Sequence, residues 1–314
     1  MSVHFSRFEK PMFRVAFEAE RGDILPLLDF LRFIYVENVR ERLLEHPLGP
    51  SHVWKAWADE TYIGFSTGRI MLQSGHRFAP AELTERPSRL PWRRDRFDVA
   101  GQERAFRRYY PSWEIDPQHR SLLAAHPASY LRVTEAVALS GVTATRMLEI
   151  GAGACVHVAF RHVLNPDMRT VIIDLPETMF SGYLLLRMMQ IDVALPHEDR
   201  DAAVTMRLPF QGVDGDFDFA FNMASFQEMN LETVNRYIHL IHSRLRPGGV
   251  FQHVNLRRSK QFPDNKVADY DLSGFASSRV VKAPYHSSLD PRHPVECVIA
   301  HKTAPVTAHT PHLT

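Results

Sequence analysis

The sequence predicts an α/β protein whose main domain is a doubly wound, mostly parallel sheet of the Rossmann-like kind. Three observations support this prediction. After Thr145, short apolar segments alternate with segments of helical periodicity, the pattern of parallel strands joined by right-handed crossovers. A glycine-rich turn follows the first apolar segment. Two strand candidates near the C-terminus, joined by a polar loop that contains proline, predict an antiparallel C-terminal strand at the end of the sheet.

The N-terminal region, residues 1–120, lacks this alternation and is expected to form a mainly helical cap or lid. Apolar spacing predicts a helix over 24–44, and Ser51 can cap a second helix over 51–57. The segment 86–108 is rich in arginine and interleaved with aromatic residues. It is either a solvated loop or a lid that closes over an anionic acceptor.

The main domain is expected over 121–303, and residues 304–314, rich in Pro, Thr and His, are expected to form a disordered tail. A helical pattern over 117–139 leads into the domain, and Pro127 predicts a break within it. The strands are expected at 146–150, 170–174, 204–208, 218–222, 250–254, 278–282 and 295–301. The crossover helices are expected at 155–164, 176–191 and 231–245.

The turn after the first strand carries Glu149, Gly151, Ala152 and Gly153. Glycines at this point permit a tight turn and let a ligand approach the backbone closely. A dinucleotide-binding turn has a third glycine for its pyrophosphate, but here Val156 occupies that position. An acid at the strand end suits a ligand with a cationic amino group, as in S-adenosylmethionine (SAM). The alternative is a turn that only starts the helix and binds no ligand.

The second strand ends at Asp174, where an acid can hydrogen-bond both hydroxyls of an adenosine ribose. NAD enzymes use the same device, so Asp174 indicates an adenosine ligand, while Val156 and the antiparallel C-terminal strand favour SAM as the cofactor. Leu175, which follows Asp174, and Asn222, at the end of the fourth strand, are expected to complete the cofactor-binding set.

These residues resemble those of class I SAM-dependent methyltransferases, over 145–302. The turn Pro247-Gly248-Gly249 also stands where such enzymes often enter their fifth strand. The resemblance implies an enzyme that uses SAM to methylate an acceptor.

A narrower similarity is to the bacterial sugar O-methyltransferase family. Residues 222–229 look like its Asn-Ser-x-x-Glu-Met segment, and 174–177 agree with its second strand and turn. Asn255 and Arg257 look like its Asn-Arg ending after the fifth strand, except that Leu256 stands between them. The similarity implies methyl transfer to a hydroxyl of a sugar or similar polar small molecule, in natural-product or glycan biosynthesis.

Catalytic candidates are expected at the ends of the fourth and fifth strands, because ligands of parallel sheets bind there. Glu228 can act as a base or hold the acceptor hydroxyl; alternatively, it is an acid favoured by the following helix dipole. His253 can act as a general base; alternatively, it is a core histidine. Gln227, Asn255 and Arg257 are expected to bind the acceptor. Alternatively, Arg257 is a solvent-facing arginine.

Two other functions remain open from the sequence: an N-, C- or carboxyl-methyltransferase of a secondary metabolite, and a catalytically silent SAM-domain partner protein. No metal is expected, because no pair of carboxylates stands at the strand ends. His239 and His242 share one helix face, but their neighbours suggest an exposed face and no zinc site.

Composition narrows the class of protein further. Lys plus Arg total 37 and Asp plus Glu 36, so the basic excess of a nucleic-acid binder is missing. No apolar run approaches the roughly 20 residues that span a membrane, and two cysteines fit a reducing compartment. A soluble cytoplasmic enzyme with a small-molecule acceptor is expected, and a homodimer is left open.

Overall fold

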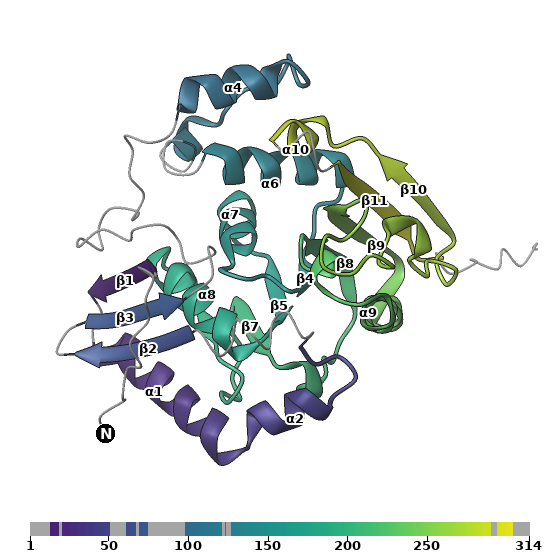
Figure 1. The fold of residues 1–314 in the computed structure, drawn as a ribbon. Coiled ribbons are helices and arrows are strands. Elements are labelled where there is room, and N and C mark those ends of the chain that lie inside the picture. The colour runs from purple at the N-terminus through teal and green to yellow at the C-terminus, as the bar shows by residue number, and fades with distance from the viewer. Residues whose placement is uncertain are drawn as a thin grey trace, which may run out of the picture.

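The computed structural model describes residues 13–18, 21–50, 61–66, 69–74, 98–120, 123, 127–289 and 294–303. The strands in these ranges form one eight-stranded sheet and a separate three-stranded sheet (Figure 1). The helix expected over 51–57, most of the arginine-rich segment and the C-terminal tail lie outside the described residues.

The large sheet is mostly parallel, with an antiparallel strand near one edge. From one edge to the other its strands are β6 (Val193–Ala194), β7 (Val204–Arg207), β5 (Arg169–Ile173), β4 (Arg146–Ile150), β8 (Phe217–Met223), β9 (Leu245–Leu256), β11 (Val295–His301) and β10 (Ser277–Val281). All pairs from β6 to β9 are parallel, whereas β11 runs antiparallel to both β9 and β10. The predicted fold class is confirmed.

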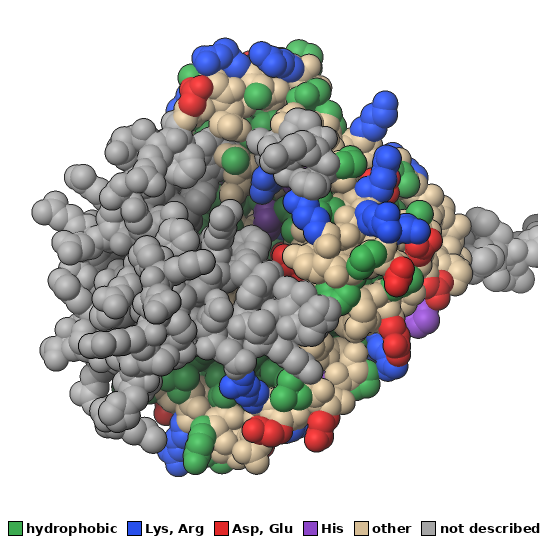
Figure 2. Space-filling view, viewed as in Figure 1, with side chains coloured by type: hydrophobic (Ala, Val, Ile, Leu, Met, Phe, Trp, Pro, Cys, Tyr) green, Lys and Arg blue, Asp and Glu red, His purple; other side chains and the backbone are tan. Residues whose placement is uncertain are grey.

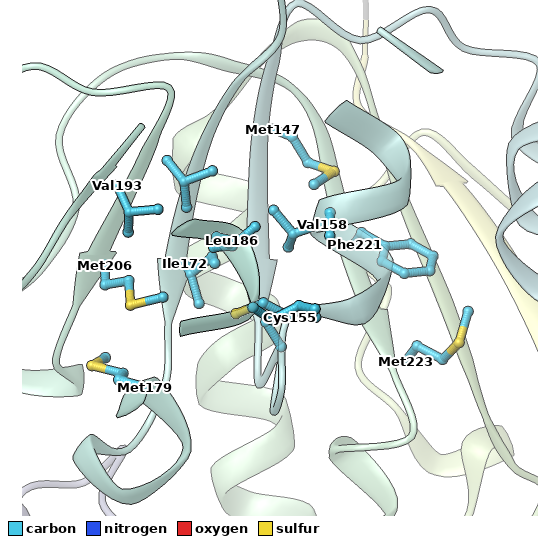
Figure 3. Close-up of a cluster of buried hydrophobic side chains, with 14 of the residues drawn as sticks. Met147, Cys155, Val158, Ile172, Met179, Leu186, Val193, Met206, Phe221 and Met223 are labelled. Atoms are coloured by element: carbon cyan, nitrogen blue, oxygen red, sulfur yellow. The ribbon is translucent and has the colours of Figure 1, made fainter. Parts of the chain in front are cut away.

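Helices cover both faces of this sheet. They are α6 (Pro127–Ser140), α7 (Val156–Leu164), α8 (Pro176–Met188), α9 (Leu231–Arg244) and α10 (Pro284–Leu289). One apolar cluster packs α7 and α8 on the first face, where Met147, Ile172 and Phe221 of the strands meet Val158 and Leu186 of the helices (Figure 3). The second face packs against α9. The short helix α10 lies in the segment for which the sequence predicts only a polar loop.

The helix α6 forms a further layer over the first face of the large sheet. It starts at Pro127, where the sequence predicts a break in the helical pattern, and ends before Gly141, which has a φ of 63°. It packs against both α7 and α10. The helix α4 (Val99–Arg107) joins the same layer, because the ring of Phe106 lies edge-on to that of Tyr285 at 5.1 Å.

The N-terminal region contains strands that the sequence analysis did not predict. β1 (Phe13–Glu18), β3 (Arg69–Ser74) and β2 (Thr61–Ser66) form the small antiparallel sheet, in that order. The helix expected over 24–44 is two helices, α1 (Arg21–Val36) and α2 (Val39–Glu45). They are separated at Asn38, whose backbone is left-handed with a φ of 46°. Packing of Phe30 on Phe180, with centroids 5.2 Å apart, holds α1 against α8.

None of the described helices combines the length and the apolar character needed to cross a lipid bilayer.

Candidate active site

The glycine turn lies at the point where the order of the parallel strands reverses. β4 pairs with β8, and the chain proceeds from β4 toward β5 on one side and from β8 toward β9 on the other. Ligands of open α/β sheets bind in the crevice beyond this point. The structure therefore puts 149–153 where the sequence predicts a binding site.

Glycine is favoured at the two positions of the turn for different structural reasons. Gly151 and Gly153 have φ values of 69° and 57°, which glycine adopts without strain. A Cβ on Gly151 would lie 2.3 Å from Oγ of Ser225, so this glycine lets the β8 loop pack closely. A Cβ on Gly153 would meet none of the described residues within 4 Å. Gly153 thus borders open space, into which a ligand can approach the backbone.

Asp174 is tied to this turn. Its Oδ2 accepts a 2.7 Å hydrogen bond from the backbone N–H of Gly153, and its Oδ1 accepts one of 2.7 Å from that of Leu175. Burial raises the pKa of Asp174 to about 6, and hydrogen bonds from the Leu175 N–H, the Thr178 side chain and the Gly153 N–H oppose that effect. A carboxylate has about four acceptor positions, so Asp174 keeps capacity to accept from a ribose.

Glu149 has a buried carboxylate oxygen that nothing in the described chain satisfies. The residue is 1% exposed, and its Oε2 has no hydrogen-bond partner. Burial raises its pKa to about 8, while the positive charge of Arg161 acts in the opposite direction. A buried polar atom of this kind needs a partner, and a cationic group on a ligand would supply one.

Asn222 and Asn255 are brought together beneath the turn, and both are fully buried. Nδ2 of Asn222 donates to the carbonyl of Ile150 at 2.8 Å, and Nδ2 of Asn255 donates to Oδ1 of Asn222 at 2.8 Å. Oγ of Ser225 donates to the same Ile150 carbonyl at 3.1 Å. These contacts hold the turn in place, so the two asparagines act on the site through its backbone.

The 3₁₀ turn η4 (Phe226–Glu228) follows β8. Oε1 of Gln227 accepts from the backbone N–H of Leu256 at 2.8 Å, which ties this turn to the end of β9. Glu228 is 7% exposed. The cap of α9 is Asn230, whose Oδ1 accepts from the N–H of Thr233 at 2.8 Å. Glu228 lies just before this helix start, so both its acceptor-binding role and a favourable interaction with the helix dipole remain open.

His253 faces the α9 side of the sheet, away from Glu149. It has no exposed surface, and its ring lies between those of Phe226, Phe251 and Tyr270, with centroids 5.2–6.4 Å away. Burial lowers its pKa to about 3. This environment favours the core histidine that the sequence left as the alternative to a general base.

Arg257 lies at the surface, where its Nε donates to Oε1 of Glu296 at 2.7 Å. Its side chain is 66% exposed. This placement favours the solvent-facing arginine over the acceptor-binding one. Among the described residues, no group of three or more His, Cys, Asp or Glu side chains comes together to hold a metal ion.

Two polar residues on one face of α7 were not predicted as site residues. His157 and Arg161 lie four positions apart, so they share this face, whereas His162 of the same helix lies on another. Arg161 is 5% exposed, and its guanidinium lies over the rings of Phe219 and Phe221 of β8. The i, i+4 spacing of two basic residues in a buried helix was the available signal.

No family model and no curated protein matches this chain. Several solved structures are similar to it. An O-methyltransferase from Bacillus cereus in complex with S-adenosylhomocysteine (SAH) is 15% identical, covers 65% of this chain and 90% of its own, and has a TM-score of 0.38. The O-methyltransferase TomG from Streptomyces achromogenes, in complex with SAM, is 18% identical, covers 66% of this chain and 89% of its own, and has a TM-score of 0.38. The N-methyltransferase NodS from Bradyrhizobium japonicum is 14% identical, covers 57% of this chain and 98% of its own, and has a TM-score of 0.40. These likenesses are remote, and the function considered next rests on the residues of this chain.

Proposed function

We propose that this chain is a SAM-dependent methyltransferase that binds its cofactor against the turn 149–153 and Asp174. The observation that carries the proposal is the unsatisfied Oε2 of Glu149, buried beside a glycine turn at the strand switch point. A ligand that places a cation there satisfies this atom. The open space at Gly153 and the spare acceptor positions of Asp174 suit the nucleoside part of the same ligand.

The same residues fit a dinucleotide poorly. Its pyrophosphate is anionic and normally binds at the start of the first crossover helix, on backbone N–H groups. Glu149 offers a pyrophosphate no favourable charge, because its ionised form repels a phosphate, and Val156 replaces the third glycine that lets the helix approach the ligand closely. The amino group of SAM is attracted by the carboxylate that would repel a phosphate.

When bound, SAM supplies an electrophilic methyl group, and the chain must orient the acceptor and exclude water. We assign the contact with the acceptor hydroxyl to Glu228, which is buried in the turn after β8. A carboxylate there can hold or remove the hydroxyl proton. Gln227 and Asn255 act as positioning residues, because their side chains join the ends of β8 and β9. His253 has no part in this assignment.

We propose a small, polar, hydroxylated acceptor of the sugar or natural-product type. The similarity of 222–229 and 174–177 to the sugar O-methyltransferase segments supports this class of acceptor. N-methylation and carboxyl-methylation differ from methylation of a hydroxyl only in the group that accepts the methyl. Analysis of the product distinguishes these three reactions.

Calorimetry with the purified chain tests the cofactor assignment, and incubation with SAM and candidate acceptors tests the reaction. We expect saturable binding of SAH, no binding of NAD, and a product heavier than the acceptor by one methyl group. Binding of NAD without binding of SAH would overturn the proposal.

A further inference from the structure

Four basic side chains meet between the outer helices and the first face of the large sheet. They are Arg132 of α6, His157 and Arg161 of α7, and His286 of α10, and we call them the basic cluster. The helix α6 packs against both α7 and α10. Burial and then the positive charges of Arg132, His286 and Arg161 lower the pKa of His157 to about 3, so the other three groups lie close enough to His157 to act on it electrostatically. Figure 2 shows Lys or Arg and His side chains together in a recess near the centre of one face.

The guanidinium donors of this basic cluster lack acceptors. Nε of Arg132 and Nε and Nη2 of Arg161 are buried and have no hydrogen-bond partner in the described chain. Nε2 of both histidines is also buried and unpartnered, and that of His286 is an acceptor, because its Nδ1 donates to Glu135. Arg161 is 5% exposed and His286 is 7% exposed. A buried donor without an acceptor costs about 1–3 kcal/mol, and more when it is charged. Several such donors converging on one region indicate that the acceptor atoms come from a ligand.

The acids nearby do not supply those acceptors. The carboxylate of Glu135 already accepts from Nδ1 of His286 at 2.7 Å, from the hydroxyl of Tyr110 at 2.7 Å, and from the backbone N–H groups of Tyr285 and His286. Four donors fill its acceptor capacity. Glu149 acts on Arg161 electrostatically, yet its Oε2 and two nitrogens of Arg161 all stay without partners. The basic cluster therefore carries an excess of positive charge.

The surroundings of the cluster are aromatic. The guanidinium of Arg161 lies 4.8 and 4.5 Å from the ring centroids of Phe219 and Phe221, and these contacts fix its plane. Phe221 pairs in register with Glu149, so this guanidinium lies close to the cofactor turn. A planar guanidinium binds carboxylate and phosphate oxygens in pairs, and a weakly polar environment strengthens such contacts.

We propose that the basic cluster binds an oxyanionic group, a carboxylate or a phosphate, that belongs to the methyl acceptor. The assignment to the acceptor rests on the proposed function, because it takes the cofactor to lie against the adjacent turn. The proposal adds a charge to the acceptor: a neutral sugar would leave these donors unsatisfied, whereas a sugar acid, a sugar phosphate or an aromatic acid would pair with them.

The test uses the full-length protein and two probes, sodium benzoate and sodium phosphate, added at constant ionic strength against chloride. We expect at least one probe to raise the melting temperature saturably and to bind in calorimetry. The probe that binds identifies the carboxylate or the phosphate as the group. Arg161→Met should weaken that binding at least about tenfold, since it removes a charged, paired donor. Arg236→Met, which removes an exposed arginine of α9, should leave binding unchanged.

Arg132→Met provides a second variant if Arg161→Met fails to fold. No saturable effect of either probe on the wild-type protein would overturn the inference, as would equal losses in the cluster variants and in Arg236→Met. A parallel titration with SAH separates the two proposals. If SAH binds and neither oxyanion does, the proposed function stands and the inference of a charged acceptor is wrong. If an oxyanion binds and SAH does not, the anion site stands and the proposed methyltransferase function is wrong.

Discussion

The backbone N–H of Gly153 and Oδ2 of Asp174 are joined by a hydrogen bond of 2.7 Å. The bond links the turn after β4 to the end of β5, so the two parts of the proposed cofactor site are fixed relative to each other. Gly151 adds a second link, because its N–H donates to the carbonyl of Ile173 at 2.8 Å. The site is therefore built into the sheet before any ligand binds, which lowers the ordering cost of binding.

Alanine at the two turn glycines should have different effects. Gly153→Ala should abolish SAH binding and cost about 1 kcal/mol of stability, the price of a left-handed alanine. Gly151→Ala should destabilise the protein more, because its Cβ would also collide with Ser225.

Gly141→Ala is the matched control. Gly141 has a φ of 63° and open space around it, but it lies outside the site. It should show the same stability loss as Gly153→Ala with unchanged SAH affinity. Melting temperature and calorimetry measure the two effects. Equal SAH affinity in Gly153→Ala and Gly141→Ala would remove Gly153 from the cofactor site.

The affinity for SAH should rise with pH. Burial raises the pKa of Glu149 to about 8, so this carboxyl is mostly protonated at pH 7 in the free protein. A cationic amino group favours the ionised form, and binding at pH 7 should release a proton. Affinity should then increase between pH 6.5 and 8. Calorimetry in two buffers of different ionisation enthalpy measures the proton, and identical heats in both buffers would contradict the role of Glu149.

Glu228→Gln should lower turnover by roughly 10²–10⁴-fold, the span expected when a general base is removed. SAH affinity should stay unchanged, because the proposed cofactor contacts lie on 149–153 and Asp174. Glu232→Gln, at an exposed acid in the first turn of α9, is the control and should keep full turnover. Initial rates with an identified acceptor measure both, and near-wild-type rates in Glu228→Gln would show that another residue contacts the hydroxyl.

His253 should control acid stability and have no effect on turnover. Its pKa is about 3 in the folded protein, against about 6.5 when unfolded, so the unfolded state binds more protons as the pH falls below 6.5. The free energy of unfolding therefore decreases as the pH falls below 6.5, by about 1 kcal/mol at pH 5.5. His253→Phe should reduce this pH dependence in urea unfolding and keep turnover. If His253→Phe instead lost turnover and kept the same acid stability, His253 would be the general base.

Local patterns account for most of the central sheet. The strand at 295–301 and the strand at 146–150 were predicted to the residue, because each is a short, mostly apolar segment. The small N-terminal sheet was missed because β1 pairs with β3 more than fifty residues away, and no local pattern reports such pairing. The break at Asn38 was missed because a left-handed asparagine interrupts a continuous helical spacing.

The site was predictable in part. Motif spacing put Glu149 and Gly153 in the turn after one strand and Asp174 at the end of the next, and the structure joins Gly153 to Asp174 by a hydrogen bond. Their role in binding a cofactor stays a prediction. Alternation along β9 puts His253 and Phe251 on one face, but it cannot tell which face lies beside Glu149. The basic cluster draws on α6, α7 and α10, so only the folded chain brings its four residues together.

The most direct test of the cofactor site compares two ligands, SAH and 5′-methylthioadenosine, which lacks the amino-acid part. Their affinities are measured for the wild type, Glu149→Gln and Asp174→Asn. In Glu149→Gln, SAH should bind at least about tenfold more weakly than in the wild type, while 5′-methylthioadenosine binds equally well, because the variant removes only the charge-assisted contact. In Asp174→Asn, both ligands should lose affinity, since both carry the ribose. Equal affinity of all three proteins for SAH would contradict the account.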